Sequence, residues 1–289
     1  MPRRRAVPLL LGAGALLVLV PGSPALARPT AEPRAAAGQV AAGTVLPASD
    51  SGPSSARRTA ARPLAGLVIA LDPGHQLGNS NPRFRAQLAQ KRFNGRAVKG
   101  CNTTGTATNA GFPEATFTWR VAVKLRAALR ALGAIVPMTR TVNSWHAWGP
   151  CVWTRGQFGA KVGARLMVQI HADGAPSSVK GFHVITPGLT RGWTDAPWRG
   201  QPIWKADLAL AKAVRRGLLA AGVTPSSSID GQISVRTDVS ALNVARIPTV
   251  TVELGNMRHA AEARRMSSDA GQGFYARALL RAVRTALGR

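Results

Sequence analysis

Acidic residues are scarce in this 289-residue chain, which has 12 Asp and Glu against 38 Lys and Arg. Only four of the acids are glutamates: Glu32, Glu114, Glu253 and Glu262. The net charge of +26 favours binding to a polyanion, although an arginine-rich composition is also typical of GC-rich genomes. Because no basic helix with interleaved aromatics and no nucleic-acid motif is present, we expect no nucleic-acid partner.

Long apolar runs are missing as well. The N-terminal run Leu9–Val20 has 12 residues, which is short of the ~20 needed to span a bilayer. Arg3-Arg4-Arg5 precede it and Ala25-Leu26-Ala27 follow it, which is the order of regions in a secretory signal peptide. We therefore predict a signal peptide over residues 1–27 and an exported protein, with an uncleaved membrane anchor as the alternative.

Cysteine is limited to two positions, Cys101 and Cys151. Export permits a disulfide between them, and we predict that it forms; two free thiols are the alternative. The bond would close a loop of about 50 residues, for which the chain-entropy model gives roughly 4 kcal/mol of stabilisation.

Residues 28–64 are dominated by Ala, Pro, Arg, Ser, Gly and Thr, a composition that predicts a disordered linker. A single catalytic domain should then span residues 65–289. In this domain short apolar runs alternate with amphipathic stretches, which predicts an α/β fold with a mostly parallel or mixed central sheet flanked by helices. The expected strands are 67–71, 135–140, 166–170, 182–186, 233–235 and 249–253, and the expected helices are 114–132, 155–163, 204–221 and 273–287.

The stretch 76–113 is rich in Asn, Gly, Thr and Arg and has little periodicity, so we expect a long loop. A lid that shapes a substrate site and a surface insertion without function are both open interpretations. Cys101 lies within this stretch, so the predicted disulfide would tether it to the rest of the domain.

Three of the expected strands lead into residues that can bind a metal or move a proton. His75 follows the first of them, His171 ends a second and Glu253 ends a third. Because the carboxyl ends of parallel strands meet at one edge of a sheet, we expect these side chains to lie close together. Glu114 begins a predicted helix whose N-terminus could face the same edge.

Two imidazoles and a carboxylate are typical ligands of zinc, and three protein ligands leave a position open for catalysis. A further carboxylate nearby can serve as general base and acid in hydrolysis. The residue types therefore indicate metal-assisted hydrolysis, although no HExxH helix is present. As alternatives, either histidine could be a hydrogen-bonded core residue, and Glu114 could simply favour a helix N-terminus.

Together these elements resemble the zinc-dependent N-acetylmuramoyl-L-alanine amidases of the Amidase_3 type, in particular their actinobacterial branch. The motifs are Asp72-Pro73-Gly74-His75, the helix that begins at Glu114, Gln169-Ile170-His171-Ala172 and Val252-Glu253-Leu254-Gly255-Asn256, in the family's order over residues 66–288. The resemblance implies a bacterial wall hydrolase in which His75, Glu114 and His171 bind Zn²⁺ and Glu253 is the catalytic carboxylate. The sequence departs from the family at Gln76-Leu77-Gly78, which replaces the usual glycine-rich continuation.

The implied reaction is hydrolysis of the amide between the lactyl group of N-acetylmuramic acid and the L-alanine of a peptidoglycan stem peptide. We expect peptidoglycan or muropeptide fragments as substrates, anionic wall polymers as further partners, a location in the wall, the periplasmic space or the medium, and a monomer. Arg236 is a candidate contact to a substrate carboxylate or oxyanion, with a surface salt bridge as the alternative. Asp72 is expected to hydrogen-bond its own turn or to orient a metal ligand.

Two other functions use the same residues. One is a different zinc hydrolase, such as a peptidase that acts on wall stem peptides. The other is a non-catalytic wall-binding protein, and the presence of all four site residues argues against it.

Overall fold

The computed structural model describes residues 62–94, 96–188 and 201–289. The predicted signal peptide 1–27, and the predicted linker 28–64 up to residue 61, lie outside the described residues. The described residues belong to one compact unit. None of the helices in the described ranges is long and apolar enough to cross a membrane.

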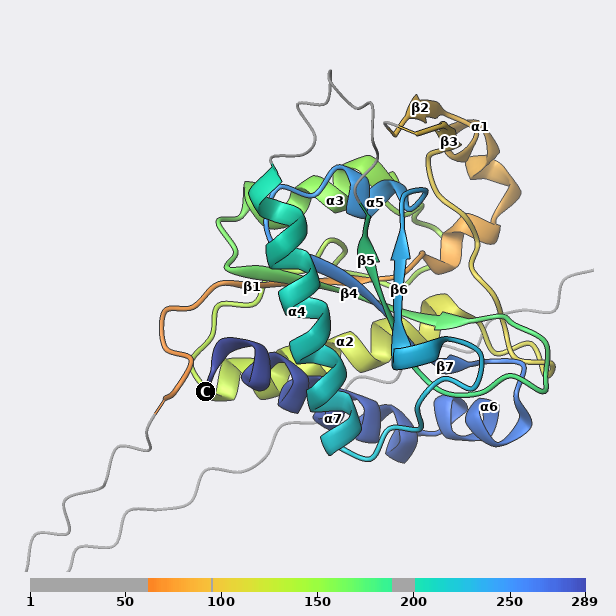
Figure 1. Ribbon diagram of the computed structural model, residues 1–289. Helices are drawn as coiled ribbons and strands as arrows, with labels where there is room; N and C mark the ends of the chain where they lie inside the picture. Colours follow the sequence, from red (N-terminus) through yellow and green to blue (C-terminus); the bar gives the residue numbers. More distant parts are fainter. Residues whose placement is uncertain (1–61, 95, 189–200) are drawn as a thin grey trace, which may run out of the picture. The chain divides into compact units, whose positions relative to one another are not determined.

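Five strands form the central sheet, in the order β1-β4-β7-β5-β6 (Figure 1). They are β1 (Ile69–Pro73), β4 (Leu166–Asp173), β7 (Thr249–Asn256), β5 (His183–Pro187) and β6 (Ile233–Arg236). Neighbouring strands are parallel except for β5 and β7, which are antiparallel. The mixed sheet with helices on both sides confirms the predicted α/β fold.

Three long helices, α2 (Glu114–Ala131), α4 (Gln201–Ala220) and α7 (Asp269–Leu287), cover one face of the sheet and share its main hydrophobic core (Figure 1). Helices α3 (Val152–Lys161) and α5 (Ser240–Asn243) lie on the other face. The apolar positions of α2 recur every three or four residues, which is why one side of this helix is buried.

The strands present different residues to the two faces. In β4, Val168 and Ile170 are buried in the main core, so Gln169 and His171 point to the opposite face. Strand β7 repeats this alternation, and Glu253 is the register partner of His171. The apolar residues of these strands therefore build the core under α2, α4 and α7, while their polar residues gather on the side of α3 and α5.

The expectation that strands end at His171 and Glu253 is wrong. Strand β4 continues to Asp173 and β7 continues to Asn256. Both strands remain hydrogen-bonded to each other beyond the two polar residues, with a register shift after His171. The two side chains thus lie on the face of the sheet near its carboxyl edge rather than at the strand ends.

The predicted strand 135–140 is wrong as a continuous strand. This segment runs parallel to β1, but only two isolated bridges form, around Ile135 and Met138. Pro137 has no N–H group and cannot donate the ladder bond between them, while its carbonyl still accepts a bond from Leu71 at 3.0 Å.

The predicted loop 76–113 is wrong in its N-terminal part, which contains five short elements. They are η1 (Leu77–Ser80), η2 (Pro82–Phe84), α1 (Arg85–Leu88), β2 (Lys91–Phe93) and β3 (Val98–Gly100). Side-chain caps stabilise them: Asn81 accepts a bond from a backbone N–H of η2, and Asn94 accepts two in the turn between β2 and β3. Such local polar bonds leave no apolar periodicity in a sequence.

The C-terminal region contains more helix than predicted. Helix α7 begins at Asp269, where Ser268 accepts a capping bond from the N–H of Gly271 at 3.1 Å. A separate helix, α6 (Ala260–Ser267), precedes it and was not predicted. Helix α3 likewise starts at Val152, directly after Cys151 and three residues before the predicted start.

Candidate metal centre

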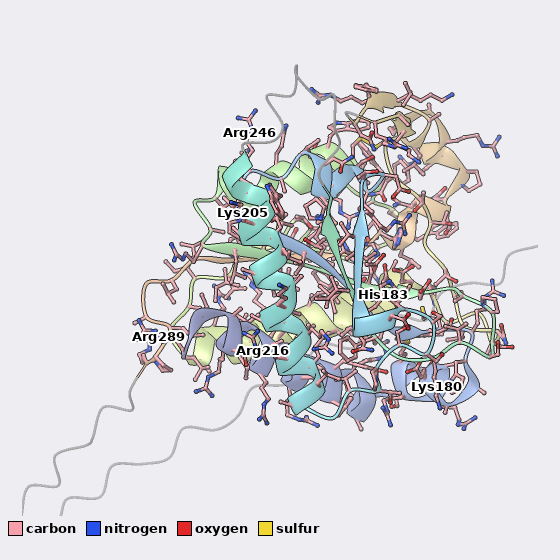
Figure 2. The ribbon with its side chains drawn as sticks, viewed as in Figure 1. Lys180, His183, Lys205, Arg216, Arg246 and Arg289 are labelled. Atoms are coloured by element: carbon pink, nitrogen blue, oxygen red, sulfur yellow. A yellow bond between two sulfur atoms is a disulfide. The ribbon has the colours of Figure 1, made fainter. Side chains whose placement is uncertain are left out.

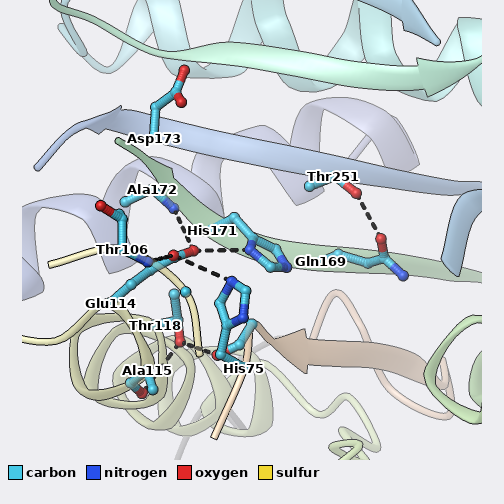
Figure 3. Close-up of polar contacts among 12 residues, drawn as sticks. His75, Thr106, Glu114, Ala115, Thr118, Gln169, His171, Ala172, Asp173 and Thr251 are labelled. Atoms are coloured by element: carbon cyan, nitrogen blue, oxygen red, sulfur yellow. Dashed lines mark hydrogen bonds and ion pairs between the residues drawn. The ribbon is translucent and has the colours of Figure 1, made fainter. Parts of the chain in front are cut away.

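Three side chains from distant parts of the chain converge where β1 and β4 meet the N-terminus of α2. His75 follows β1, Glu114 is the first residue of α2, and His171 belongs to β4. One ligand atom from each lies within 4.8 Å of the other two. The Glu114 carboxylate is 3.2 Å from His75 Nε2 and 2.9 Å from His171 Nδ1 (Figure 3).

The backbone and one hydrogen bond fix the direction of the His75 ring. His75 has a φ of 59°, a left-handed conformation that is uncommon for residues other than glycine and often occurs at functional sites. Its Nδ1 donates to the carbonyl of Thr103 at 3.0 Å, and a carbonyl can only accept. Nε2 therefore faces the Glu114 carboxylate at 3.2 Å, the position from which a histidine can bind a metal held beside that carboxylate.

Glu114 is buried and holds the centre together. Besides the two imidazoles, its carboxylate accepts bonds from the N–H groups of Thr106 at 2.9 Å and Ala172 at 3.2 Å (Figure 3). Burial would raise the pKa of Glu114, but charge attraction and hydrogen bonds from His75 and His171 outweigh it and hold that pKa well below its usual range. The site therefore carries an ionised carboxylate between two imidazoles, which is a donor set suited to zinc.

Two glycines allow the ligands to approach each other so closely. A Cβ atom on Gly74 would lie 2.4 to 2.7 Å from three atoms of the His171 ring. A Cβ atom on Gly105 would lie 2.7 Å from Glu114 Oε2, and Gly105 also has a φ of 80°. At both positions, any side chain larger than hydrogen would collide with a ligand residue.

We expect Gly74→Ala to weaken zinc binding by about 10–100-fold, the size of effect seen when groups that orient metal ligands are disturbed. The added methyl group must push the His171 ring away from Glu114. Zinc titration by calorimetry measures the change. Gly100→Ala is the control, because its Cβ would make only an ordinary contact of 3.6 Å with Leu88. Equal zinc affinity in both variants would contradict the prediction.

Glu253 lies beside this centre on the next strand. It lines a pocket of about 300 Å³ together with His75, His171 and Arg155. Its Oε2 atom is buried and has no hydrogen-bond partner in the described part of the chain. Burial, followed by repulsion from Glu114 and Asp173, raises the pKa of Glu253 well above its usual range. A carboxylate with a raised pKa is a stronger proton acceptor than an ordinary glutamate.

The two remaining predicted site residues have partners that the sequence did not indicate. Among the described residues, Asp72 hydrogen-bonds neither its own turn nor a metal ligand: its Oδ1 accepts from Thr139 Oγ1 at 2.5 Å and from Arg155 Nε at 2.8 Å. Arg236 lines the pocket but donates two bonds to Asp238, at 2.9 and 2.8 Å, as in the alternative of a surface salt bridge.

Sequence reasoning missed Arg155, whose Nη2 lies 3.3 Å from His171 Nε2. It is one of many arginines in an arginine-rich chain, and no local pattern sets it apart. Its significance comes from contacts with Asp72 and His171, which are 83 and 16 residues away in the sequence.

The predicted disulfide between Cys101 and Cys151 is present. It joins the segment that orients His75 to the start of α3, which carries Arg155. Two further bonds accompany it: Val152 N–H donates to the Cys101 carbonyl at 2.7 Å, and Asn102 donates to the Pro150 carbonyl at 2.8 Å. The disulfide thus supports two sides of the site.

We expect the double variant Cys101→Ser with Cys151→Ser to lose about 4 kcal/mol of unfolding free energy, the chain-entropy value for a loop of this length. Urea denaturation of the oxidised wild type and of the variant measures the difference. Reduced wild type is the control and should match the variant. Identical midpoints for all three proteins would show that the bond adds no stability.

Comparisons with known proteins identify similar sequences and similar folds. The family model described as N-acetylmuramoyl-L-alanine amidase matches residues 69–285. The N-acetylmuramoyl-L-alanine amidase Rv3717 of Mycobacterium tuberculosis is 38% identical over 235 residues, which cover 80% of this chain and 90% of that protein. The crystal structure of the amidase Ami1 from Mycobacterium smegmatis has a TM-score of 0.69 and 35% identity, and covers 78% of this chain and 98% of its own. The crystal structure of the apo form of Ami1 from Mycobacterium abscessus has a TM-score of 0.68 and 36% identity. The match covers 78% of this chain and 100% of the Ami1 chain.

Proposed function

Because this chain belongs to the N-acetylmuramoyl-L-alanine amidase family, we propose that it performs the amidase reaction with a zinc ion held by His75, Glu114 and His171. The reaction hydrolyses the amide between the lactyl group of N-acetylmuramic acid and the L-alanine of a peptidoglycan stem peptide. The observation that carries the zinc proposal is the convergence of three ligand atoms within 4.8 Å, with both imidazoles turned toward one ionised carboxylate.

The donor set fits the metal in chemistry as well as in position. Two imidazole nitrogens and one carboxylate match catalytic zinc sites, which keep one coordination position free for the reaction. When bound, zinc supplies Lewis-acid polarisation of the carbonyl and lowers the pKa of water. The N–H groups of Thr106 and Ala172 keep Glu114 oriented between the histidines.

Glu253 is proposed as the group that moves the proton. Its raised pKa and its Oε2 atom without a hydrogen-bond partner make it ready to accept the proton of the attacking water. The protonated carboxyl then donates this proton to the alanine nitrogen as the C–N bond breaks. The products are a glycan with a lactyl carboxylate and a stem peptide with a free amino terminus.

We further propose export through the predicted signal peptide 1–27, action as a monomer, and retention on anionic wall polymers. Without the signal peptide, the chain has a net charge of +23. Figure 2 shows cationic side chains on α4 (Lys205 and Arg216) and at the C-terminus (Arg289). Sedimentation with isolated cell walls at low and high salt tests the retention, which should weaken as salt screens the charges.

The amidase is tested by mass spectrometry of muropeptides incubated with purified residues 28–289, with and without a chelator. We expect release of stem peptides with a free alanine amino terminus, loss of this release with chelator, and recovery when zinc is restored. Activity that is indifferent to chelator would refute the metal assignment.

The same product masses separate the amidase from the other functions. A peptidase would cut within the stem peptide and leave alanine attached to the glycan. A wall-binding protein would release no peptide with or without chelator.

A further inference from the structure

Arg155 is a buried cation in the wall of the catalytic pocket, and the proposed mechanism does not yet use it. The residue is 3% exposed and lines the same pocket of about 300 Å³ as His171 and Glu253. Its Nε donates to the buried carboxylate of Asp72 at 2.8 Å, which anchors one edge of the guanidinium. Asp72 itself lies fully buried in β1, so this anchor is rigid.

The two buried arginines near Asp72 carry more positive charge than this one carboxylate can neutralise. Arg140 is also buried, and burial, followed by repulsion from Arg155, lowers the pKa of Arg140 to about 9, whereas Asp72 raises it. The single carboxylate of Asp72 thus interacts with two guanidinium groups, directly with Arg155 and through its charge with Arg140.

The position of Arg155 next to His171 is unusual for a neighbour of a metal ligand. A ligating histidine normally donates its second N–H to a carboxylate, a carbonyl or a water. Here Nη2 of Arg155, which can only donate, lies 3.3 Å from His171 Nε2. In the metal-free site His171 Nε2 can accept this bond, because the ring proton can lie on Nδ1 toward Glu114 at 2.9 Å.

Metal binding changes this pairing, and this step rests on the zinc site proposed above. His171 Nδ1 lies beside Glu114, so its lone pair would be the one offered to a metal held by these ligands. A neutral imidazole has one proton, which must then lie on Nε2. Nε2–H and Nη2–H are both donors and cannot bond to each other. Nη1 and Nη2 of Arg155 have no other hydrogen-bond partner among the described residues. These two nitrogens can therefore donate to an acceptor in the pocket.

We propose that Arg155 donates a hydrogen bond from its terminal nitrogens to the oxygen of the scissile lactyl carbonyl. The carbonyl carbon must lie between the metal centre and Glu253, and all three groups line one pocket. The bond strengthens as negative charge develops on this oxygen when water adds to the carbon, and it weakens when the C–N bond breaks and the carbonyl re-forms. Arg236, which the sequence suggested for this role, already donates from Nε and Nη2 of its guanidinium to the carboxylate of Asp238.

The test replaces the ion pair as a unit, because removing Arg155 alone leaves the buried Asp72 carboxylate with the Thr139 hydroxyl but without its ion-pair partner. In the double variant Asp72→Asn with Arg155→Gln, asparagine keeps the size of Asp72, and glutamine, although shorter than arginine, can hydrogen-bond to it. We expect a kcat lower by about 10²–10³-fold, the usual effect of losing one donor to a developing oxyanion. KM should change by less than about threefold.

Four companion measurements make the outcome decisive. Zinc affinity by calorimetry and the melting temperature of the metal-free protein should stay close to wild type, because Arg155 is not a ligand. Asp72→Asn alone keeps the guanidinium in the pocket and should lose less than about tenfold in kcat. Arg277→Gln, on the exposed side of α7, controls for the loss of one positive charge and should leave kcat unchanged.

Each of three other results would contradict the proposal. Weaker zinc binding with unchanged kcat per bound zinc would make Arg155 a positioning residue for His171. An equal loss in Asp72→Asn and in the double variant would assign the effect to the anchor. If wild type releases no stem peptide in the same assay, the amidase function itself fails and this proposal falls with it.

Discussion

The variant Glu253→Gln should lose about 10²–10⁴-fold in kcat, the range expected when a general base is removed. Glutamine has nearly the same shape but cannot accept the proton of water or pass it to the alanine nitrogen. The Oε2 atom without a hydrogen-bond partner and the raised pKa of Glu253 are the observations that motivate this expectation. Steady-state release of stem peptide from a muropeptide measures it, at equal zinc occupancy.

The same variant should be more stable than wild type at neutral pH in the metal-free state. The pKa of Glu253 is raised in the folded protein, so the folded state holds this proton to a higher pH than the unfolded state. Folding stability therefore falls as pH rises from the pKa of Glu253 in the unfolded state to its pKa in the folded state. Above this pH window, wild type has lost the full stability that protonated Glu253 contributes, and this loss is its penalty. Glutamine removes the penalty, and the difference between the proteins should vanish at acid pH.

Thermal melts of metal-free wild type and Glu253→Gln across this pH range provide the check. A variant that is inactive but also less stable at neutral pH would indicate a structural defect rather than loss of a base. Near-wild-type turnover in a folded, zinc-loaded variant would refute the role of Glu253.

The variant Glu114→Gln should weaken zinc binding by at least about 100-fold and abolish amidase activity at limiting zinc, since effects of ligands exceed those of groups that merely orient them. The amide retains the size of the carboxylate but removes the charge that attracts both imidazoles. Its NH₂ group would also face the N–H of Thr106 or Ala172, which now donate to the carboxylate.

Glu262→Gln is the matched control for this variant. Glu262 is also buried and accepts backbone N–H bonds from Gly181 and Asn256, but it has no imidazole neighbour among its bonds. It should therefore lower stability without changing zinc affinity. Calorimetric zinc titrations of both variants decide the matter, and equal zinc affinities in the two would contradict the assignment of Glu114.

Several features of the fold followed from local pattern. Short apolar runs around Leu71, Ile170 and Val252 predicted buried strands, and regular apolar spacing from Phe117 onward predicted helix α2. Elements built from polar capping bonds, such as the β2–β3 hairpin around Asn94, escaped prediction. Apolar periodicity in a sequence indicates that one face of a helix or strand is buried. A hairpin stabilised by side-chain caps buries little apolar surface, so it lacks this periodicity.

Polar alternation within β4 and β7 was a signal that the sequence contained and the prediction did not use. Gln169 and His171 alternate with Val168 and Ile170, and Glu253 lies in the same position of its strand as His171. This period of two shows that one face of the sheet is apolar and the other carries the site. The interpretation as strand ends instead placed the site only at the edge.

By itself the sequence determined which chemical groups are available: two histidines and two glutamates in the motifs of the amidase family, two cysteines that can pair, and strands of the right length to carry them. Only the tertiary structure decided that Glu114 lies between two imidazoles, 57 residues from His171, and that Arg155 reaches across 83 residues to Asp72. These residues lie close together because β1, β4 and β7 are neighbours in the sheet, in this order. Strand order depends on the total free energy of burying every apolar face at once, which no local pattern of residues contains.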